Sequence, residues 1–303
     1  MKLLITGASG FLGGHLLAVA RQSYATVGLY LTFPVELPGT TLLPGDLSNP
    51  TALQKILDRE MPSVIIHNAA LANPEICEQM PEHAYQINVT ATSAIVDWCQ
   101  ANAARLIYIS TDLVFDGRHG NYSEDDAPSP VNVYGRTKAE AEQVVLRRLP
   151  NALVCRLALM YGRGFWRRHY ASEWLERELW RRSEQPDLPP LLLFTDQWRS
   201  MLTVNNATEL ILELVASSIN GILHLGGAER ISRYDFGLRL CQKLGIDSAC
   251  IRGIKTSDAP TAVPRPVDVS LNIQRAARLL KTPLLDIKSG MDCAYSTATN
   301  YLK

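Results

Sequence analysis

The sequence predicts an α/β protein built on a doubly wound parallel sheet of the Rossmann type, with a smaller C-terminal α/β lobe. Short apolar runs bounded by turn residues recur along the first half of the chain, and helix-like stretches separate them. A chain of 303 residues also leaves room for a second unit, because domains usually contain about 100–200 residues. Both observations favour a large nucleotide-binding core followed by a smaller lobe.

The elements of the predicted sheet follow one another as strand and helix, the order typical of a parallel sheet. The predicted strands are Leu3–Thr6, Thr26–Leu31, Ser63–His67, Arg105–Ser110 and Ala152–Leu157. The predicted helices between and after them are Gly13–Ser23, Thr51–Glu60, Glu82–Ala101 and Tyr134–Leu149.

The character of the sequence changes after Arg156. Residues 1–156 are the predicted Rossmann domain, which residues 197–226 complete through a helix at Val204–Ser218 and a strand at Ile222–Leu225. Residues 157–196 and 227–303 are the predicted second lobe. This lobe includes later helices at Ser232–Leu244 and Asn272–Lys281.

Composition narrows the classes of partner. Thirty basic and thirty acidic residues give a formal net charge of +0, which provides no field to attract nucleic acid or an anionic membrane. No apolar run approaches the roughly 20 residues that a membrane span needs, and Gly7 interrupts the apolar N-terminus. We therefore expect a cytoplasmic protein that binds neither nucleic acid nor membrane.

Cysteine and histidine spacing gives no sign of a metal site. The six cysteines are scattered without a Cys-x-x-Cys pair, which favours buried reduced thiols over disulfides or zinc ligands. His67 and His224 end strand-like runs and are interpreted as core or loop histidines. We predict no catalytic metal.

A glycine-rich loop follows the first strand. Gly7, Gly10 and Gly13 are spaced Gly-x-x-Gly-x-x-Gly and open a helix, so the backbone can approach a pyrophosphate at the helix N-terminus. We predict a dinucleotide site here, formed by these glycines together with Ser9, Phe11 and Leu12. Residues 1–156 are therefore the predicted NAD(P)-binding domain.

The end of the second predicted strand bears on which dinucleotide binds. An acid at this point would bind the adenosine ribose and repel a 2′-phosphate, but the chain has Tyr30-Leu31-Thr32-Phe33 instead. No arginine stands beside Thr32, although Arg21 lies near the end of the preceding helix. The sequence favours NADP(H) slightly and leaves NAD(H) open, with Thr32 predicted to contact the cofactor.

Tyr134 and Lys138 stand four residues apart on a predicted helix. This spacing places both side chains on one face, so the ammonium can favour the phenolate and bring the tyrosine pKa down from about 10. The hydroxyl of Thr111 can donate to a developing oxyanion. We predict that Thr111, Tyr134 and Lys138 are the catalytic residues of a nicotinamide-dependent enzyme; the alternative is a protein that binds the cofactor without turnover.

These motifs together resemble the extended short-chain dehydrogenase/reductase superfamily, and within it the dTDP-4-dehydrorhamnose reductase group. The resemblance spans nearly the whole chain. It rests on Thr6–Gly13, Gly45-Asp46-Leu47, His67-Asn68-Ala69-Ala70, Asn88-Val89, Ser110–Gly117, Tyr134–Lys138, Asp196-Gln197 and Arg265-Pro266.

The resemblance implies further cofactor contacts. Asp46 and Leu47 would flank the adenine, and Ala69 and Ala70, preceded by Asn68, would line the nicotinamide side. Lys138 would also bind the nicotinamide ribose, and Asn88 would help to position the active-site backbone and the lysine.

The resemblance also bears on the substrate. It implies substrate-side positions for Arg199 and Arg265, while Asp112, beside Thr111, is a further candidate that more readily fixes its loop. Arginines and tryptophans gather between residues 163 and 199, where they suit a nucleotide diphosphate or form an ordinary amphipathic helix equally well. Leu113 and Trp198 depart from the rhamnose reductase pattern, which leaves the sugar open.

The first functional hypothesis is therefore NAD(P)H-dependent reduction of a 4-keto nucleotide sugar. One alternative is a nucleotide-sugar epimerase, in which the cofactor is reduced transiently and regenerated. Another is a non-catalytic, NADP-binding regulatory subunit like the β-subunit of methionine adenosyltransferase. The segment Asp196-Gln197-Trp198-Arg199, with its arginine, resembles the corresponding segment of that subunit. A homodimer is compatible with each of these.

Overall fold

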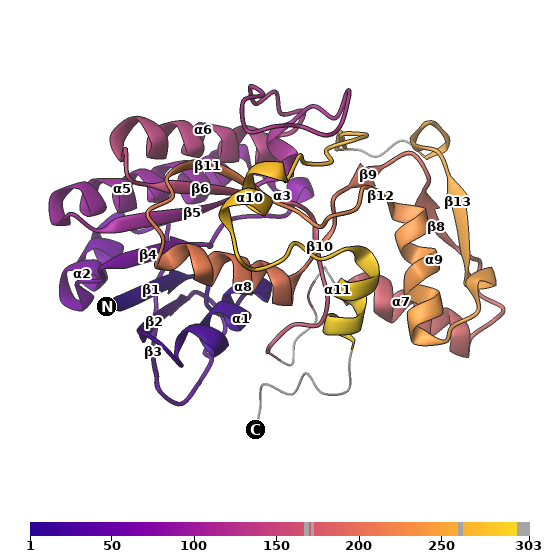
Figure 1. The fold of residues 1–303 in the computed structure, drawn as a ribbon, viewed down its shortest axis with the longest axis horizontal. Helices are drawn as coiled ribbons and strands as arrows, with labels where there is room; N and C mark the ends of the chain where they lie inside the picture. The colour runs from indigo at the N-terminus through magenta and orange to yellow at the C-terminus, as the bar shows by residue number, and fades with distance from the viewer. Residues whose placement is uncertain (167–169, 171–172, 260–262, 296–303) are drawn as a thin grey trace.

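The computed structural model describes residues 1–166, 170, 173–259 and 263–295, and its main feature is a seven-stranded parallel sheet (Figure 1). The strand order is β3-β2-β1-β4-β5-β6-β11. The bounds are β1 Lys2–Thr6, β2 Ala25–Tyr30, β3 Thr40–Pro44, β4 Val64–His67, β5 Arg105–Thr111, β6 Leu153–Leu157 and β11 Gly221–Leu225. This arrangement confirms the predicted doubly wound α/β class.

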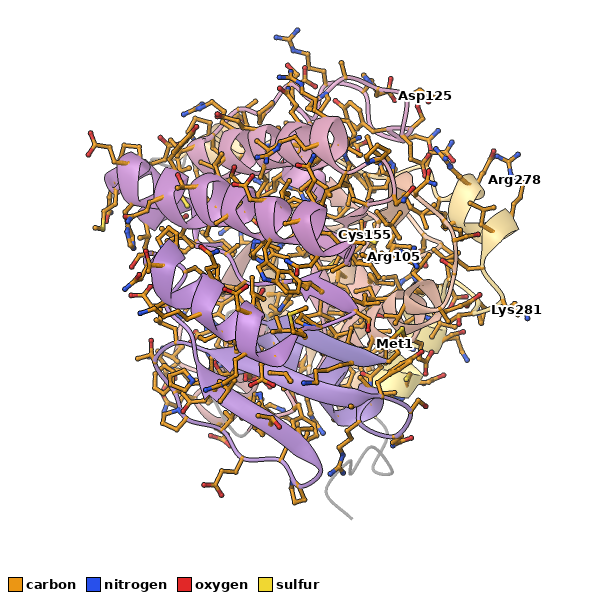
Figure 2. The ribbon with its side chains drawn as sticks, turned by 90° about the vertical axis from the view of Figure 1, so that its left-hand side faces the viewer. Met1, Arg105, Asp125, Cys155, Arg278 and Lys281 are labelled. Atoms are coloured by element: carbon orange, nitrogen blue, oxygen red, sulfur yellow. The ribbon has the colours of Figure 1, made fainter. Side chains whose placement is uncertain are left out.

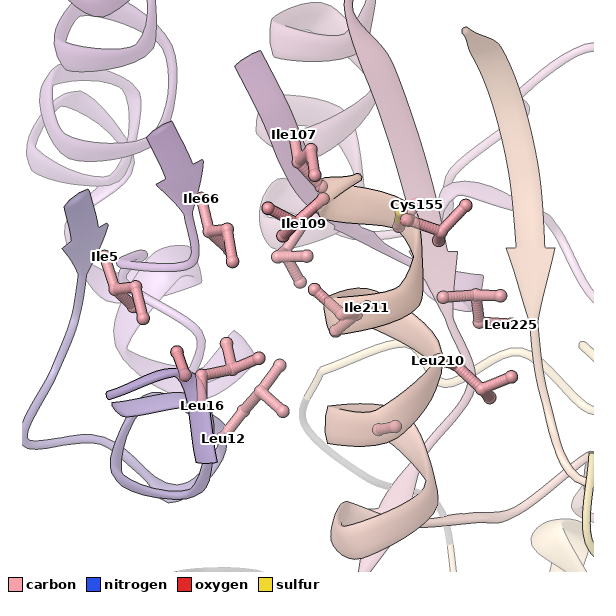
Figure 3. Close-up of a cluster of buried hydrophobic side chains, with 14 of the residues drawn as sticks. Ile5, Leu12, Leu16, Ile66, Ile107, Ile109, Cys155, Leu210, Ile211 and Leu225 are labelled. Atoms are coloured by element: carbon pink, nitrogen blue, oxygen red, sulfur yellow. The ribbon is translucent and has the colours of Figure 1, made fainter. Parts of the chain in front are cut away.

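Helices cover both faces of the sheet. One layer contains α1 (Phe11–Ala20) and α8 (Val204–Val215), and the other contains α2 (Pro50–Glu60), α5 (Ala91–Asn102) and α6 (Val133–Arg148). Figure 3 shows the first interface, where Leu12 and Leu16 of α1 and Ile211 of α8 meet Ile66 and Ile107 of the strands. Burial of apolar side chains on both faces explains why these strands read as continuous apolar runs.

The direction of winding reverses between β1 and β4. From β1 the chain proceeds outward to β2 and β3, then returns to β4 on the other side of β1 and continues to β5, β6 and β11. Ligands of open α/β sheets bind outside the carboxyl ends of the strands at such a reversal. The loops that follow β1 and β4 are therefore the first place to seek the site.

A second lobe packs beside the carboxyl edge of the sheet (Figure 1). It contains the parallel pair β8 (Leu191–Phe194) and β13 (Ile251–Ile254), with α7 (Trp174–Glu184), α9 (Arg233–Leu244) and α11 (Ile287–Ala294). Its own core includes Leu179, Leu193, Phe236 and Met291.

Short strand pairs join the two lobes. β7 (Met160–Tyr161) pairs with β10 (Leu202–Thr203), and β9 (Trp198–Arg199) pairs with β12 (Ile231–Ser232). The loop between β5 and α6, which carries Asp125, stands at the top of the molecule in Figure 2. It contacts the segment after β13, because Tyr122 N donates to Ser270 O (2.9 Å).

The structure differs from the prediction in one helix that it divides and in one strand that was not predicted, while the ends of other helices shift by a few residues. The helix expected at Glu82–Ala101 is divided into α4 (Pro81–Tyr85), a π-helical turn at Gln86–Thr90 and α5. The strand β3 was missed. The fold also contains two short helices, α3 (Pro74–Gln79) and α10 (Gln274–Leu279).

Within the described residues, no helix combines the length and apolarity needed to cross a bilayer. All six cysteines are free thiols, four of them buried. No group of three metal-ligating side chains occurs in the same described part of the chain.

Candidate active site

The glycine-rich loop connects β1 to α1 and has the geometry of a phosphate cradle. Gly7 has a φ of +70°, which favours glycine, and a Cβ on Gly13 would stand 2.1 Å from the Gly7 carbonyl oxygen. No side chain caps the N-terminus of α1 at Gly10, and its first turn carries no acid. Because the first N–H groups of a helix lack intrahelical acceptors, this end can receive a pyrophosphate.

The second lobe contacts the same loop. Trp166 Nε1 donates to the Ala8 carbonyl (2.9 Å), and the Tyr170 hydroxyl donates to the Ser9 carbonyl (3.0 Å). The ring of Tyr170 also lies 5.5 Å from that of Phe11. The predicted residue Leu12 is buried in the core below, so only its backbone is available to a ligand.

The residues predicted to meet the adenosine follow β2 and β3. Thr32 is exposed in the turn after β2, and Asp46 is exposed while Leu47 is buried. Arg21 Nη1 donates to the Pro38 carbonyl (2.6 Å), which places its guanidinium against the loop that begins at Thr32. The Arg21 guanidinium therefore lies beside the loop where the 2′-phosphate of NADP(H) would bind.

A chain of hydrogen bonds holds the loop after β4. Thr6 Oγ1 accepts from the backbone N–H groups of Asn68 (3.0 Å) and Ala69 (2.9 Å) and lies 2.8 Å from His67 Nδ1. His67 Nε2 lies 3.0 Å from Thr92 Oγ1, whose hydroxyl donates to the Asn88 carbonyl. Thr6 therefore donates its hydroxyl proton to Nδ1, and His67 is a neutral Nε2–H tautomer.

Burial, and to a smaller extent the nearby charge of Lys138, lowers the pKa of His67 to about 3. His67 is thus a core histidine, as expected, and it fixes the backbone of Asn68 and Ala69. Ala70 follows in the same half-buried turn.

Asn88 connects the cofactor loop to helix α6. It lies in the π-helical turn Gln86–Thr90, accepts from Leu71 N (2.8 Å) and donates to Thr137 Oγ1 (2.9 Å). Thr137 is adjacent to Lys138. π-Helical turns recur at functional sites because they redirect one side chain out of the regular helical ladder.

The structure brings Thr111, Tyr134 and Lys138 together at the end of β5. Asn132 caps α6 by accepting from Gly135 N (2.9 Å), so the helix starts one residue before Tyr134. Thr111 lies close enough to the Tyr134 hydroxyl to lower its pKa. Lys138 Nζ is buried, donates to the Ile109 carbonyl (2.6 Å) and lies 4.0 Å from the centre of the Tyr108 ring.

The predicted fall in the Tyr134 pKa is wrong for this structure. Burial raises the pKa of Tyr134 well above its usual value near 10, the charge of Asp112 raises it further, and the nearby Thr111 opposes both. Burial also lowers the pKa of Lys138 to about 7, because the ammonium loses its hydration. Tyr134 is therefore protonated at neutral pH, which is the form that donates a proton.

Asp112 lies directly beside the catalytic candidates. Its carboxylate accepts from Thr111 Oγ1 (3.2 Å) and from Leu159 N (3.3 Å). Burial raises the pKa of Asp112 to about 6, and the positive charge of Arg199 counteracts part of that rise. These contacts fit the loop-fixing interpretation; a substrate contact by Asp112 stays a prediction.

The two predicted substrate arginines occupy different settings. Arg199 is buried, and its guanidinium donates to the carbonyls of Trp198 (2.7 Å), Val267 (3.1 Å) and Pro266 (3.1 Å). It therefore fastens the segment after Arg265 to β9. Arg265 is partly exposed and pairs with Glu75 of α3.

Arg233, at the start of α9, was not singled out from the sequence. Burial lowers its pKa to about 10, and the charges of Arg199 and Arg265 lower it further. The three guanidinium groups thus share one positive region near Asp112, a setting that attracts an anion.

The tryptophan-rich region forms α7, whose buried residue is Leu179. Trp174 and Trp180 are 40% and 42% exposed, and Arg163 and Arg182 pair with Glu176 and Glu178 of the helix. The amphipathic-helix interpretation therefore fits the described part of this region. Residues 167–169 and 171–172 lie outside the described residues.

Three further residues at the site escaped sequence reasoning. Glu142 and Arg156 form a buried ion pair behind Lys138 (2.8 Å), and the amide nitrogen of Gln197 is buried without a hydrogen-bond partner among the described residues. Gln197 was visible only as part of the Asp196-Gln197 pair. Nothing in the spacing of Glu142 distinguishes it from a surface charge, whereas the position of Arg156 inside the predicted strand Ala152–Leu157 was a signal of burial.

A Rossmann sheet, a glycine cradle and a Thr-Tyr-Lys set at the end of β5 define an NAD(P)-dependent oxidoreductase of the extended short-chain dehydrogenase/reductase type. The family model described as the RmlD substrate binding domain matches residues 1–299. The chain therefore belongs to the RmlD-like, dTDP-4-dehydrorhamnose reductase family.

Individual relatives match over nearly their full length. The dTDP-4-dehydrorhamnose reductase of Mycobacterium tuberculosis is 29% identical, with 99% of this chain and 94% of that one covered. Methionine adenosyltransferase 2 subunit beta of Xenopus tropicalis is 29% identical, with 92% and 82% covered. The crystal structure of a hypothetical dTDP-4-dehydrorhamnose reductase from Sulfolobus tokodaii has a TM-score of 0.82 and 29% identity, covering 95% and 98%.

Proposed function

We propose that this protein uses NAD(P)H to reduce the 4-keto group of a nucleotide sugar. The observation that carries the proposal is the placement of Tyr134 one helical turn before the buried Lys138, whose ammonium donates to the Ile109 carbonyl at the end of β5, with the buried Thr111 two residues further along that strand. The name of the Mycobacterium tuberculosis relative gives the first substrate to test, dTDP-4-dehydrorhamnose.

The residues of the chain supply the proton and the orientation. The nicotinamide, when bound, supplies the hydride that reaches the carbonyl carbon. Tyr134 protonates the developing alkoxide, and the Thr111 hydroxyl donates to the same oxygen. Lys138 places a positive charge beside the tyrosine after it has lost its proton, which stabilises the phenolate.

The cofactor would lie across the switch point of the sheet. The α1 N-terminus and the glycine cradle would hold the pyrophosphate, and Ala69 and Ala70 would face the nicotinamide. NADP(H) is preferred over NAD(H) in this proposal because β2 ends without an acid and Arg21 lies against the following loop. Arg199, Arg233 and Arg265 would attract the diphosphate of the sugar nucleotide.

The test is a reductase assay with NADPH and, separately, NADH, against a panel of 4-keto nucleotide sugars. Stoichiometric loss of absorbance from the reduced nicotinamide establishes the reductase and ranks cofactors and sugars. Isomerisation of a nucleotide sugar without net oxidation of the cofactor would replace the proposal with an epimerase.

A second candidate, a regulatory subunit, is favoured by the similarity to methionine adenosyltransferase 2 subunit beta, which covers 92% of this chain and 82% of that one. The two roles separate in one further experiment. A regulatory subunit forms a stable complex with the catalytic subunit of methionine adenosyltransferase on size-exclusion chromatography and oxidises no NAD(P)H with any keto sugar.

A further inference from the structure

Three residues of α6 contact three consecutive residues of β5. Lys138 Nζ donates to the carbonyl of Ile109, Glu142 accepts from the hydroxyl of Ser110, and the hydroxyl of Tyr134 lies near Thr111. Tyr134, Lys138 and Glu142 are spaced by four, so they lie on one face of the helix. Glu142 is therefore the third member of the same row as the two catalytic candidates.

The carboxylate of Glu142 is held from its other side by Arg156 of β6. Arg156 Nε donates to Oε1 and Oε2 (3.1 Å each), and its Nη2 donates to Oε2 (2.8 Å). The side chains of Arg156 and Glu142 are 1% and 2% exposed. Such a pair is costly to desolvate, so its presence behind an active site calls for a role beyond stability.

The neighbours of Arg156 on the adjacent strands carry no charge, so Glu142 is the charged group that its guanidinium contacts. Arg156 pairs in register with Ser110 on one side and His224 of β11 on the other. Its Nη1 lies 3.4 Å from His224 Nε2, while His224 Nδ1 donates to the Tyr122 carbonyl (3.0 Å). Burial lowers the pKa of His224 to about 3, so this histidine is neutral and adds no charge.

We propose that Glu142 and Arg156 form an opposed pair of positioning residues for the reaction: Glu142, one helical turn from Lys138 on the same face of α6, keeps the lysine charged, and Arg156 limits how strongly it does so. The inference rests on the proposed function for its kinetic consequence, but it concerns the ionisation of Lys138 itself. The Glu142 carboxylate stabilises the ammonium electrostatically, whereas Arg156 neutralises most of that carboxylate.

The charged and titratable groups around Lys138 come from three elements. His67 of β4 is neutral, Tyr108 of β5 presents its ring face, and Tyr134 and Glu142 share α6 with the lysine. Among these groups, Glu142 is the one that raises the pKa of Lys138 against the effect of burial. A change of charge at Glu142 or at Arg156 should therefore shift the pKa of Lys138.

Two matched variants break the same ion pair but move Lys138 in opposite directions. In Glu142→Gln the carboxylate is lost and Arg156 remains, so the Lys138 pKa falls. In Arg156→Gln the carboxylate is released from its partner, so the Lys138 pKa rises. We expect shifts on the order of one pH unit, the size that a nearby unit charge produces at an effective dielectric constant of about 20.

The first readout needs no substrate. Protein labelled with ¹⁵N at lysine Nζ is titrated by NMR in wild type and in both variants, with Lys138→Arg used to assign the Lys138 resonance. Opposite shifts of the Lys138 titration support the proposal. Unchanged titrations, or shifts in the same direction, contradict it even if the protein proves to be no reductase.

The second readout is the pH profile of kcat/KM for reduction. The alkaline limb should move to lower pH in Glu142→Gln and to higher pH in Arg156→Gln, since reduction requires the ammonium. If a single variant fails to fold, the double variant Glu142→Gln/Arg156→Gln removes both charges. In the double variant the pKa of Lys138 should fall, but by less than the fall expected from the loss of Glu142 alone. A rise in the pKa of Lys138 in the double variant would overturn the proposal.

Discussion

At the scale of single residues, the reaction depends on one proton donor. In the proposed reaction this donor is Tyr134, because burial raises its pKa and favours the protonated phenol that carbonyl reduction requires. Lys138 and His67 contribute through charge and position. Asn88 accepts a hydrogen bond from the Leu71 backbone and donates one to Thr137, so it links the loop after β4 to helix α6.

Removal of the Tyr134 hydroxyl is expected to abolish proton donation with little effect on cofactor binding. Tyr134→Phe should lower kcat by about 100-fold or more, since positioned acids contribute about 10²–10⁴-fold. Steady-state reduction and NADPH titration by fluorescence measure both quantities. Tyr85→Phe is the matched control, because Tyr85 is 44% exposed and its hydroxyl contacts Glu140 on the helix surface. Activity of Tyr134→Phe within a few-fold of wild type would refute the assignment.

Sequence reasoning identified the catalytic candidates but not the residues that hold them. Tyr134, Lys138 and Thr111 could be found because their types and order are distinctive. Glu142 could not, since a glutamate four residues after a lysine on a helix is usually a solvated charge. Its burial depends on Arg156, which is adjacent only through the pairing of β6 with β5.

At the scale of elements, the β1–α1 connection decides whether a dinucleotide can bind. The helix begins so close to the strand that Gly13 faces the Gly7 carbonyl. The central strands were predictable because both faces of each are buried. The edge strand β3 was missed because none of its residues is buried and it ends in proline, so it lacks the apolar run of a central strand.

Gly13→Ala is expected to damage the cofactor site. The new Cβ would stand 2.1 Å from the Gly7 carbonyl oxygen, so the helix must move away from the loop that holds the pyrophosphate. We expect NADPH affinity to fall by at least about tenfold, equal to roughly 1.4 kcal/mol, measured by titration calorimetry. Gly221→Ala is the control: its site is open although φ is +80°, so it should lose stability but keep cofactor affinity. Equal affinities in the two variants would rule out this account of the loop.

At the scale of the whole molecule, two lobes meet over the carboxyl edge of the sheet. Trp166 and Tyr170 of the second lobe bond the glycine loop, and Arg199 fastens the segment at Pro266 and Val267. The change in sequence after Arg156 predicted a second lobe, and its role in binding substrate stays a prediction. The contacts between lobes were not, because they join residues separated by more than 60 positions.

Buried neutral histidines make stability depend on pH. The folded pKa values of His67 and His224 are about 3, against 6.5 when exposed, so the unfolded chain binds more protons as pH falls from 6.5. Asp112 opposes this loss of stability below pH 6. Its pKa in the folded protein is raised to about 6, so the folded protein takes up a proton there before the unfolded chain does. We expect the unfolding free energy to be about 2–3 kcal/mol lower at pH 5 than at pH 7 by urea denaturation.

The variant His67→Asn/His224→Asn isolates the histidine contribution to that pH dependence. Its unfolding free energy should change by less than half as much between pH 7 and pH 5. A variant that loses as much stability as wild type over this interval would show that other groups cause the effect.

The central claim is net hydride transfer to a sugar carbonyl, and an isotope experiment tests it most directly. The protein is incubated with NADPH carrying deuterium at nicotinamide C4, in each stereochemical form, together with dTDP-4-dehydrorhamnose. The account predicts that one form delivers a single deuterium to C4 of the product sugar, with one NADP⁺ formed per sugar reduced. Recovery of unlabelled sugar and unchanged NADPH from wild-type protein with bound cofactor would contradict it.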